Sequence, residues 1–513
     1  MPDDPPFTTA PRLTGVLIRV ENGDVVAADA TGLTLRLPDQ VLADLRLRLG
    51  GPGDAPTPDP AAILGDIDAW NLRADGAWWH FTARLAPGGT ARGYRRAIAG
   101  GDILADAPGP LYALLRLGGA RAAGFNDGPA AFAQHVLAPG DDIGAVGLEG
   151  TGAVSATAAL QQIPHRSRDA LIADTLLGWR HEAMRGLPLF MVRAETDGSA
   201  DIAALGQGLA WANFRAALDS LVAAAAALGK CPRVLAVSLD YGLEDQTSTA
   251  AGFAEGMRAL MRQIIRDLGA RGLTRPVFLI PAEAGTHWLT DHPAIRALAD
   301  LARGEDALHV TLPAPGYMFA QTRHGRPTAG ARARMAAMDA HAIVSLSQHE
   351  PWFCPLLLLA ESEGATIRVT ARAMGDLVIE DAFGTGPACG FHLTGTATPC
   401  RVTGASLAPD DPQALLLTCD AAPEAAAGQP APLLHYAHGA APGPGPGGHP
   451  ANRGALRDTW AAPCAGGPLH RWALPAVLPV HRGGPPAPQA DAVPNRKEAR
   501  KRARRQERQD LGL

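Results

Sequence analysis

The sequence predicts an α/β protein in which a parallel sheet with flanking helices is joined to β-rich modules at its N-terminal and C-terminal ends. First, apolar runs of strand length alternate with long alanine-rich segments from about residue 169 to residue 345. Second, short runs of alternating apolar and polar residues, separated by Gly, Pro and Asp, fill residues 356–480. Strand–helix repetition predicts a parallel sheet covered by helices, and the alternating runs predict antiparallel strands.

The strands expected in the α/β core are short and apolar, and the helices between them carry apolar residues at helical spacing. The strands are expected at residues 187–194, 233–239, 276–280 and 307–312, and the helices at residues 209–228, 250–269 and 328–343. In sheets of this kind the ligand crevice lies at the carboxyl ends of the strands. Functional side chains are therefore expected directly after these strands.

Changes in composition divide the chain into five expected parts. Alternating residues with turn steps such as Asn22-Gly23 predict β-hairpins near the N-terminus. The expected parts are an N-terminal β-hairpin module at 1–60, a mixed segment of unknown type at 61–139, the α/β core at 140–345, a β-sandwich-like module at 356–480, and a Pro-rich and basic tail at 481–513.

The bulk composition is that of a folded globular chain, with 47% hydrophobic and 19% charged residues. The formal net charge of −5 gives no reason to expect nucleic-acid binding over the whole chain. No apolar run reaches the roughly 18–20 residues of a membrane span. The N-terminal residues lack the basic and apolar regions of a secretory signal. We therefore expect synthesis in the cytoplasm and no membrane segment.

The sequence predicts neither a metal centre nor a cofactor site. The six cysteines form no CxxC pair, and no two histidines are spaced H-x-x-x-H on an expected helix. His435 and His438 flank Tyr436 in an expected strand, where alternation would send the two rings to opposite faces. The sequence has no P-loop, and no G-x-G-x-x-G lies between a strand and a helix.

A series of short motifs follows the expected strands and continues into the C-terminal β-module. The motifs are Asp197-Gly198-Ser199, Asp240–Asp245, Gln321–His324 followed by Gly330, Gly390–Gly395, Leu434–Gly439, Asn452–Ala455 and Leu474–Ala476. Their order and spacing resemble the sialate O-acetylesterase branch of the SGNH/GDSL hydrolases. This resemblance implies an SGNH-like α/β sheet and a scaffold that handles carbohydrate esters.

Ester hydrolysis needs a nucleophile, a base, a group that orients the base, and donors for the oxyanion. The family places its serine in a turn after the first strand of the core, and the candidate turn here offers Thr151 or Ser155. The alternative is a glycine-rich turn without chemistry. The resemblance assigns the base to His324, whose alternative is a solvated surface histidine. Gln321 stands where the family has a carboxylate, and an amide cannot stabilise an imidazolium in the same way.

The resemblance also implies substrate contacts near the strand ends. Tyr241, Gly242, Glu244 and Asp245 follow an apolar strand and are expected to line the crevice, although the two carboxylates are equally suited to capping the next helix. Two further candidates are the backbone N–H of Ser199, for a bound anion, and the ring of Trp288, for stacking on a sugar. A plain turn and a core tryptophan are their alternatives.

The C-terminal run Arg496–Arg508 is strongly basic, which suits docking to an acidic surface or nucleic acid, or else a solvated terminus. The missing serine turn and the missing carboxylate favour recognition or assembly over catalysis. We therefore expect a degenerate esterase scaffold in a phage, or in a phage-like gene transfer agent, as an oligomer or part of an assembly. Its expected partner is a cell-surface polysaccharide or O-acetylated sugar. The alternatives are an active carbohydrate O-acetylesterase and a scaffold without a sugar role.

Overall fold

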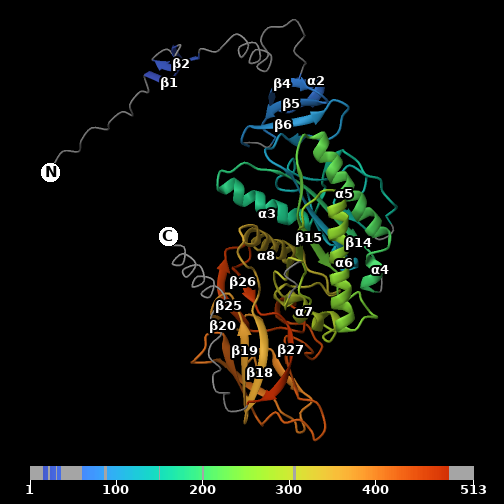
Figure 1. Cartoon of the computed structure of the whole chain (residues 1–513), viewed down its shortest axis with the longest axis vertical. Coiled ribbons are helices and arrows are strands. Elements are labelled where there is room, and N and C mark those ends of the chain that lie inside the picture. The colour runs from blue at the N-terminus through green and yellow to red at the C-terminus, as the bar shows by residue number, and fades with distance from the viewer. Residues whose placement is uncertain are drawn as a thin grey trace, which may run out of the picture. The chain divides into compact units, whose positions relative to one another are not determined.

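The structure is a computed structural model, and it describes residues 15–20, 23–29, 32–35, 60–85, 89–148, 151–198, 201–303 and 308–483. The chain divides into two compact units, residues 1–99 and residues 100–513. Figure 1 shows the described elements and labels many of them, and each unit is described by itself below.

The first unit contains two small antiparallel sheets. Strands β1 (Gly15–Val20), β2 (Gly23–Asp29) and β3 (Gly32–Leu35) form the hairpins expected near the N-terminus. The short helix α2 (Pro60–Leu64) precedes β4 (Ala69–Asp75), β5 (Trp78–Ala83) and β6 (Arg92–Ala97), which pair in sequence order. The segment that composition left without a type therefore begins with a β-meander.

The second unit is built on a parallel sheet whose central strand comes first in sequence. Its five core strands run in the spatial order β14-β8-β15-β16-β17, which is the doubly wound order 2-1-3-4-5. The strands are β8 (Leu111–Gly118), β14 (Leu189–Thr196), β15 (Pro232–Asp240), β16 (Val277–Leu279) and β17 (Val310–Thr311). Strand β8 lies before the border expected at residue 140, so the sheet begins earlier than the sequence indicated.

Additional strands extend this sheet beyond β14. Strand β10 (Val136–Pro139) and strand β11 (Val146–Gly147) both pair with β14 in parallel, and β12 (Leu160–Gln162) pairs with β10 antiparallel. The short strands β7 (Leu104–Ala105), β9 (Phe125–Asp127) and β13 (His165–Ser167) lie in the connections.

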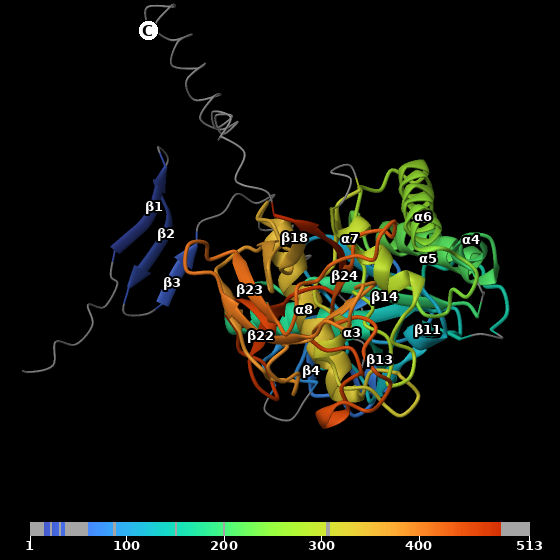
Figure 2. The ribbon, with the colours of Figure 1, turned by 90° about the horizontal axis from the view of Figure 1, so that it is seen from below.

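Helices cover both faces of the sheet, as Figures 1 and 2 show. Helices α3 (Arg168–Glu182) and α8 (Ala329–Ser347) pack together on one side. The other side carries α5 (Leu209–Ala227), α6 (Ala250–Ala270) and α7 (Pro293–Arg303), with the short α4 (Ile202–Leu205) beside α6. The helices expected at 209–228, 250–269 and 328–343 are confirmed, and α3 and α7 are additional.

Hydroxyl caps explain where several of these helices begin. Ser167, Thr249 and Thr328 each accept a hydrogen bond from the backbone N–H three residues later, at the starts of α3, α6 and α8. Such caps satisfy N–H groups that have no partner inside the helix. None of the helices among the described residues combines the length and the apolar character that crossing a membrane requires.

The C-terminal module contains a seven-stranded sheet and a three-stranded sheet, in agreement with the β-rich module expected from the sequence. The larger sheet has the order β21-β24-β27-β18-β19-β23-β22, and the smaller has the order β20-β25-β26. The strands are β18 (Leu356–Glu363), β19 (Thr366–Arg372), β20 (Leu377–Ile379), β21 (Phe391–Thr394), β22 (Val402–Leu407), β23 (Ala414–Cys419), β24 (Leu433–Tyr436), β25 (Leu456–Ala462), β26 (Leu469–Trp472) and β27 (Ala476–Arg482).

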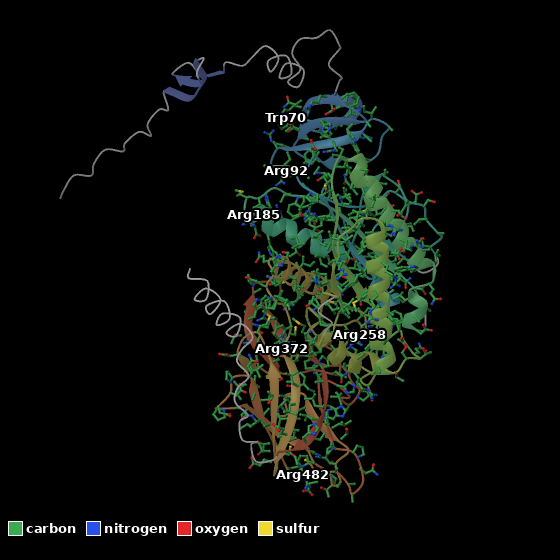
Figure 3. All side chains as sticks on the ribbon, in the orientation of Figure 1. Trp70, Arg92, Arg185, Arg258, Arg372 and Arg482 are labelled. Atoms are coloured by element: carbon green, nitrogen blue, oxygen red, sulfur yellow. The ribbon has the colours of Figure 1, made fainter. Side chains whose placement is uncertain are left out.

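Figure 3 places Arg372 and Arg482 at opposite ends of the larger sheet of this module. Their positions follow from the register, because Arg372 pairs with the first residue of β18 and Arg482 pairs near its end. The remaining short helical turns are η1 (Ala120–Ala123), η2 (Gly316–Met318) and η3 (Pro446–Gly448).

An aromatic cluster joins this module to the helices of the α/β domain. The rings of Trp352 and Trp460 meet edge to face at 4.9 Å, and His341 of α8 packs against both. The guanidinium of Arg471 lies 5.4 Å and 5.5 Å from the two indole centroids and pairs with the fully buried Asp458. Trp352 is buried and Trp460 half-buried in this cluster.

Candidate functional site

The crevice of a doubly wound sheet lies at the carboxyl ends of the strands where the strand order reverses, which here is between β8 and β15. Strand β8 is the first parallel strand of the core, and its turn consists of Gly118, Gly119, Ala120 and Arg121. No residue of this turn has a hydroxyl or thiol side chain. The turn after the first strand therefore offers no nucleophile.

Close packing explains why this turn begins with two glycines. A Cβ atom on Gly119 would lie 2.5 Å from Cδ of Glu244, and one on Gly118 would lie 2.4 Å from the backbone oxygen of Asp240. The backbone of the turn is thus pressed against the segment that follows β15. The Gly119 N–H also donates to the Asp240 backbone oxygen at 3.0 Å.

Arg121 links the ends of three neighbouring strands. Its backbone N–H donates to Glu244 Oε1 at 3.1 Å, its Nε lies 3.4 Å from the same oxygen, and its Nη2 donates to Glu283 Oε2. Glu283 Oε1 accepts the N–H groups of Ala284 and Gly285, both at 3.1 Å. Burial lowers the pKa of Arg121, but the carboxylates of Glu283 and Glu244 outweigh it and hold the pKa above its ordinary value.

A second group of charges lies near the crevice and is buried except for Asp240, whose side chain is 19% exposed. Arg116 Nη2 pairs with Asp169 Oδ1 at 3.1 Å, and Arg168 pairs with Asp240 Oδ2 at 3.2 Å and with Asp339 Oδ2 at 3.1 Å. These residues come from β8, α3, the end of β15 and α8. Because buried charges are tolerated only with partners, the network fixes these elements relative to one another.

The carboxylates of this network differ in their protonation. Burial raises the pKa of Asp339 to about 6, with Arg168 and Arg116 acting against the rise. Burial also acts to raise the pKa of Asp240. The nearby Arg168, Arg116 and Arg121 outweigh this effect, so the pKa of Asp240 lies below its usual value. Burial also raises the pKa of Asp169, against the opposing effect of Arg116 and Arg168.

His324 lies apart from this carboxylate chemistry. Its side chain is exposed, and its Nε2 atom accepts a hydrogen bond from Arg323 Nε at 3.0 Å. The side chain of Gln321 donates to the backbone oxygen of Gly285 at 3.0 Å and is therefore not directed at the imidazole. The ring therefore contacts a guanidinium, whereas a histidine base needs an orienting partner such as a carboxylate.

Thr151 lines a cavity of about 200 Å³ at the carboxyl end of β14, one strand away from the crevice. Its hydroxyl donates to the backbone oxygen of Leu148, so no histidine takes its proton. Ser155 is exposed. The cavity is lined by Leu148, Thr151, Glu195, Thr196, Asp197, Leu209, Ala210 and Asn213.

The cavity has a polar floor and an apolar rim. Glu195 is buried and accepts from Arg193 Nε at 2.5 Å, while Arg193 also pairs with Asp141 at 2.9 Å. Burial raises the pKa of Glu195. The rim carries two exposed leucines, Leu148 and Leu209, which are 48% and 44% exposed. This combination suits a small ligand that has hydroxyl groups and apolar faces.

Asn213 holds the segment that contains Thr151. Its Oδ1 atom accepts the N–H of Val154 at 3.1 Å, and its Nδ2 atom donates to the backbone oxygen of Gly152 at 3.1 Å. This asparagine was not predicted as a functional residue, since it lies inside an alanine-rich helix. Its position on the apolar face of the expected helix could have indicated a buried polar side chain with a specific partner.

The block after β15 has mixed roles. Glu244 belongs to the crevice, and Gly242 lies against Glu283. Asp245 accepts hydrogen bonds from the backbone N–H groups of Ile202, Thr247 and Ser248. It does not cap the next helix as the alternative expected, because the N-cap of α6 is Thr249. Tyr241 is buried, and burial and nearby carboxylates raise its pKa.

Trp288 and Ser199 are the two remaining residues that were predicted to contact the substrate. Trp288 is 56% exposed and lies in the loop that follows β16, which also contains Glu283. Ser199 lies outside the described residues.

The expectation that His435 and His438 face opposite ways is wrong. Strand β24 ends at Tyr436, and Ala437 has a φ of 48°, so alternation stops before His438. The Nδ1 atoms of the two histidines lie 3.1 Å apart. Among the described residues, no group of three or more His, Cys, Asp or Glu side chains is placed to hold a metal ion.

Comparison with known proteins gives no family. No family model matches the chain, and no curated protein matches it. Among solved structures, the chain is similar to a carbohydrate acetylesterase from Xanthomonas citri, with 16% identity over 73% of this chain and 87% of that chain and a TM-score of 0.43.

The raised pKa of Asp339 predicts that the free energy of unfolding falls as this carboxyl ionises. Because the folded-state pKa of about 6 lies above the ordinary value of 3.8, the folded state binds this proton more tightly, and raising the pH from 4 to 7 removes stability. We expect the free energy of unfolding of Asp339→Asn, relative to that of the wild type, to rise by roughly 2 kcal/mol from pH 4 to pH 7. Urea midpoints at each pH measure this gain.

The matched control is Asp376→Asn, which changes an exposed carboxyl. Its difference from the wild type should stay flat over the same range. A flat difference for Asp339→Asn would show that this carboxyl is ionised throughout.

Proposed function

We propose that this chain is a carbohydrate-directed recognition or assembly protein on a degenerate SGNH esterase scaffold. The carrying observation is the turn after β8, where the family has its serine. Here the turn contains Ala120 and Arg121, and Arg121 is engaged by Glu244 and Glu283. A hydroxyl nucleophile needs a base within hydrogen-bond reach, and the described crevice supplies neither group.

The same edge of the sheet offers two features suited to a sugar chain. The cavity at β14 has hydrogen-bonding groups on its floor, and Trp288 after β16 presents an exposed indole. Strands β14 and β16 are separated by β8 and β15, which puts their ends roughly 14 Å apart. We propose that a polysaccharide, O-acetylated or not, runs along this edge, with one sugar in the cavity and another against Trp288.

Docking within a phage or phage-like particle remains a proposal that rests on the sequence. The basic run Arg496–Arg508 lies outside the described residues. Removing residues 496–513 should prevent incorporation of the chain into particles if the run is the dock, and unchanged incorporation would contradict that role.

The proposal predicts no ester hydrolysis. The full chain should release p-nitrophenol from p-nitrophenyl acetate at the rate of the buffer, and His324→Ala and Thr151→Val should behave identically. An initial-rate assay at pH 7.5 measures this. Hydrolysis that falls on either substitution would instead establish the active acetylesterase.

Recognition predicts a role for Trp288. We expect Trp288→Ala to weaken retention on a column of O-acetylated bacterial polysaccharide by roughly tenfold in affinity, because a stacked ring contributes about 1 kcal/mol or more. Leu407→Ala removes another exposed apolar side chain from the C-terminal module and is the matched control. Equal retention of the wild type and Trp288→Ala would remove the tryptophan from the binding surface.

A further inference from the structure

A segment of the C-terminal module lies along the loop that contains Glu283 and Trp288. This segment, residues 437–453, is called the strap below, and the loop comprises residues 282–292. Backbone hydrogen bonds run from strap to loop: Gly439 N to Thr290 O at 2.9 Å, Gly443 N to His287 O at 2.6 Å, and Ala451 N to Thr286 O at 3.3 Å.

Asn452 reinforces the same contact with its side chain. Its Nδ2 atom donates to the backbone oxygens of Ala284 at 3.0 Å and Thr290 at 2.7 Å, and its Oδ1 atom accepts the N–H of Ala440 at 2.9 Å. The residue is fully buried. The strap therefore fixes the conformation of the loop, and with it the position of Trp288.

Three stacked imidazoles lie at the start of the strap. The ring of His392 lies 4.6 Å from that of His435 with an interplanar angle of 8°, and His435 lies 5.3 Å from His438 with an angle of 17°. His435 is 9% exposed and His438 is 2% exposed. His392 and His435 come from the paired strands β21 and β24, so the sheet itself holds two of the rings in register.

The contacts of the ring nitrogens define a directed chain. Thr394 Oγ1 lies 2.9 Å from His435 Nε2, the two Nδ1 atoms are 3.1 Å apart, and His438 Nε2 lies 3.4 Å from Asp291 Oδ1. A proton on His438 Nε2 faces the carboxylate. His438 Nδ1 then accepts from His435 Nδ1, and His435 Nε2 accepts from the threonine hydroxyl.

This series of hydrogen bonds between two neutral imidazoles can accept one additional proton but not two. With one added proton, both ring nitrogens of His438 are protonated, and His438 Nδ1 donates to His435 Nδ1. His435 is then protonated on Nε2 and donates to the Thr394 hydroxyl oxygen. With a second, N–H groups on both Nδ1 atoms face each other across 3.1 Å. Two positive charges then lie in one buried stack, which is strongly unfavourable.

Two charged residues of opposite sign act on the stack within the part of the chain that the structure describes. Asp291 and Arg296 face it from the loop and α7, and they pair with each other at 2.8 Å. Burial, together with the His392 and His438 rings, lowers the pKa of His435 to about 4. Burial also lowers the pKa of His392 and of His438, the latter against the opposing effect of Asp291.

We propose that the His392–His435–His438 stack is an acid-sensitive latch that holds the strap on loop 282–292 at neutral pH and releases both when the stack is doubly protonated. The inference stands on contacts between the module and the α/β domain and does not depend on sugar binding. Its chemical consequence is a loop whose exposed tryptophan is held in place only above mildly acidic pH.

The direction of the effect follows from the lowered pKa values. Released histidines take up protons at their ordinary value near 6.5, while the latched rings resist protonation. The contribution of the latch is therefore complete above about pH 6.5 and is lost as the pH falls toward 4.

Hydrogen–deuterium exchange of the full chain at pH 7.0 and pH 4.5, corrected for intrinsic rates, tests the latch. In the wild type, exchange in peptides covering 282–292 and 437–453 should rise about tenfold or more at pH 4.5 relative to peptides of β18 and β19. The double variant His435→Gln/His438→Gln should lose this difference. The control His481→Gln, an exposed histidine in β27, should keep it.

A wild type without the pH response, or a double variant that retains it, overturns the latch. The variant Asp291→Asn keeps the test decisive if the double variant does not fold, because Asp291 is exposed. Loss of this carboxylate removes the charge that favours a proton on His438, so the pH midpoint of release should fall. An unchanged or higher midpoint would contradict the latch.

Discussion

The pairing of two buried arginines with aspartates holds the centre of this fold together. Arg116 and Arg168 are each 2% exposed, and both reach Asp240 at the end of β15, while Arg168 also reaches Asp339 of α8. A guanidinium removed from water must keep its carboxylate partners, so the strands and helices that supply them cannot move independently. The turn after β8 is set by the same constraint, because it is pressed against the segment that Asp240 begins.

This constraint determines what the crevice can do. The turn supplies Arg121, and the neighbouring strand ends supply Glu244 and Glu283, so the charges at the switch point satisfy one another. A site for acyl transfer would instead keep a hydroxyl, a base and donors free for the substrate. The features still available for a ligand lie to either side, in the cavity at β14 and at Trp288.

The sequence was sufficient for elements whose periodicity is set by one buried face. The helices α5, α6 and α8 and the strands β14 and β15 lie close to their predicted positions, because apolar spacing records burial directly. Strand β8 was missed as the start of the sheet, since its arginine interrupts the apolar run, and an arginine inside a strand is accommodated only by partners distant in sequence. The cluster of Arg121, Glu244 and Glu283 could not be predicted for the same reason, although Glu244 alone was singled out.

The histidines show a second limit of sequence patterns. Alternation separates His435 from His438 only while the strand continues, and one residue with positive φ reverses the outcome. His438 then enters the strap, whose hydrogen bonds to loop 282–292 bring together segments about 150 residues apart. Neither composition nor spacing contains that information.

Covalent labelling tests most directly whether this edge of the sheet lacks an activated hydroxyl. The full chain would be incubated with a fluorophosphonate at pH 7.5 and analysed by intact and peptide mass spectrometry. We expect an unmodified chain, because no described hydroxyl in the crevice or the adjacent cavity has a histidine to accept its proton. An adduct on Thr151 or Ser155 that disappears in His324→Ala would contradict it.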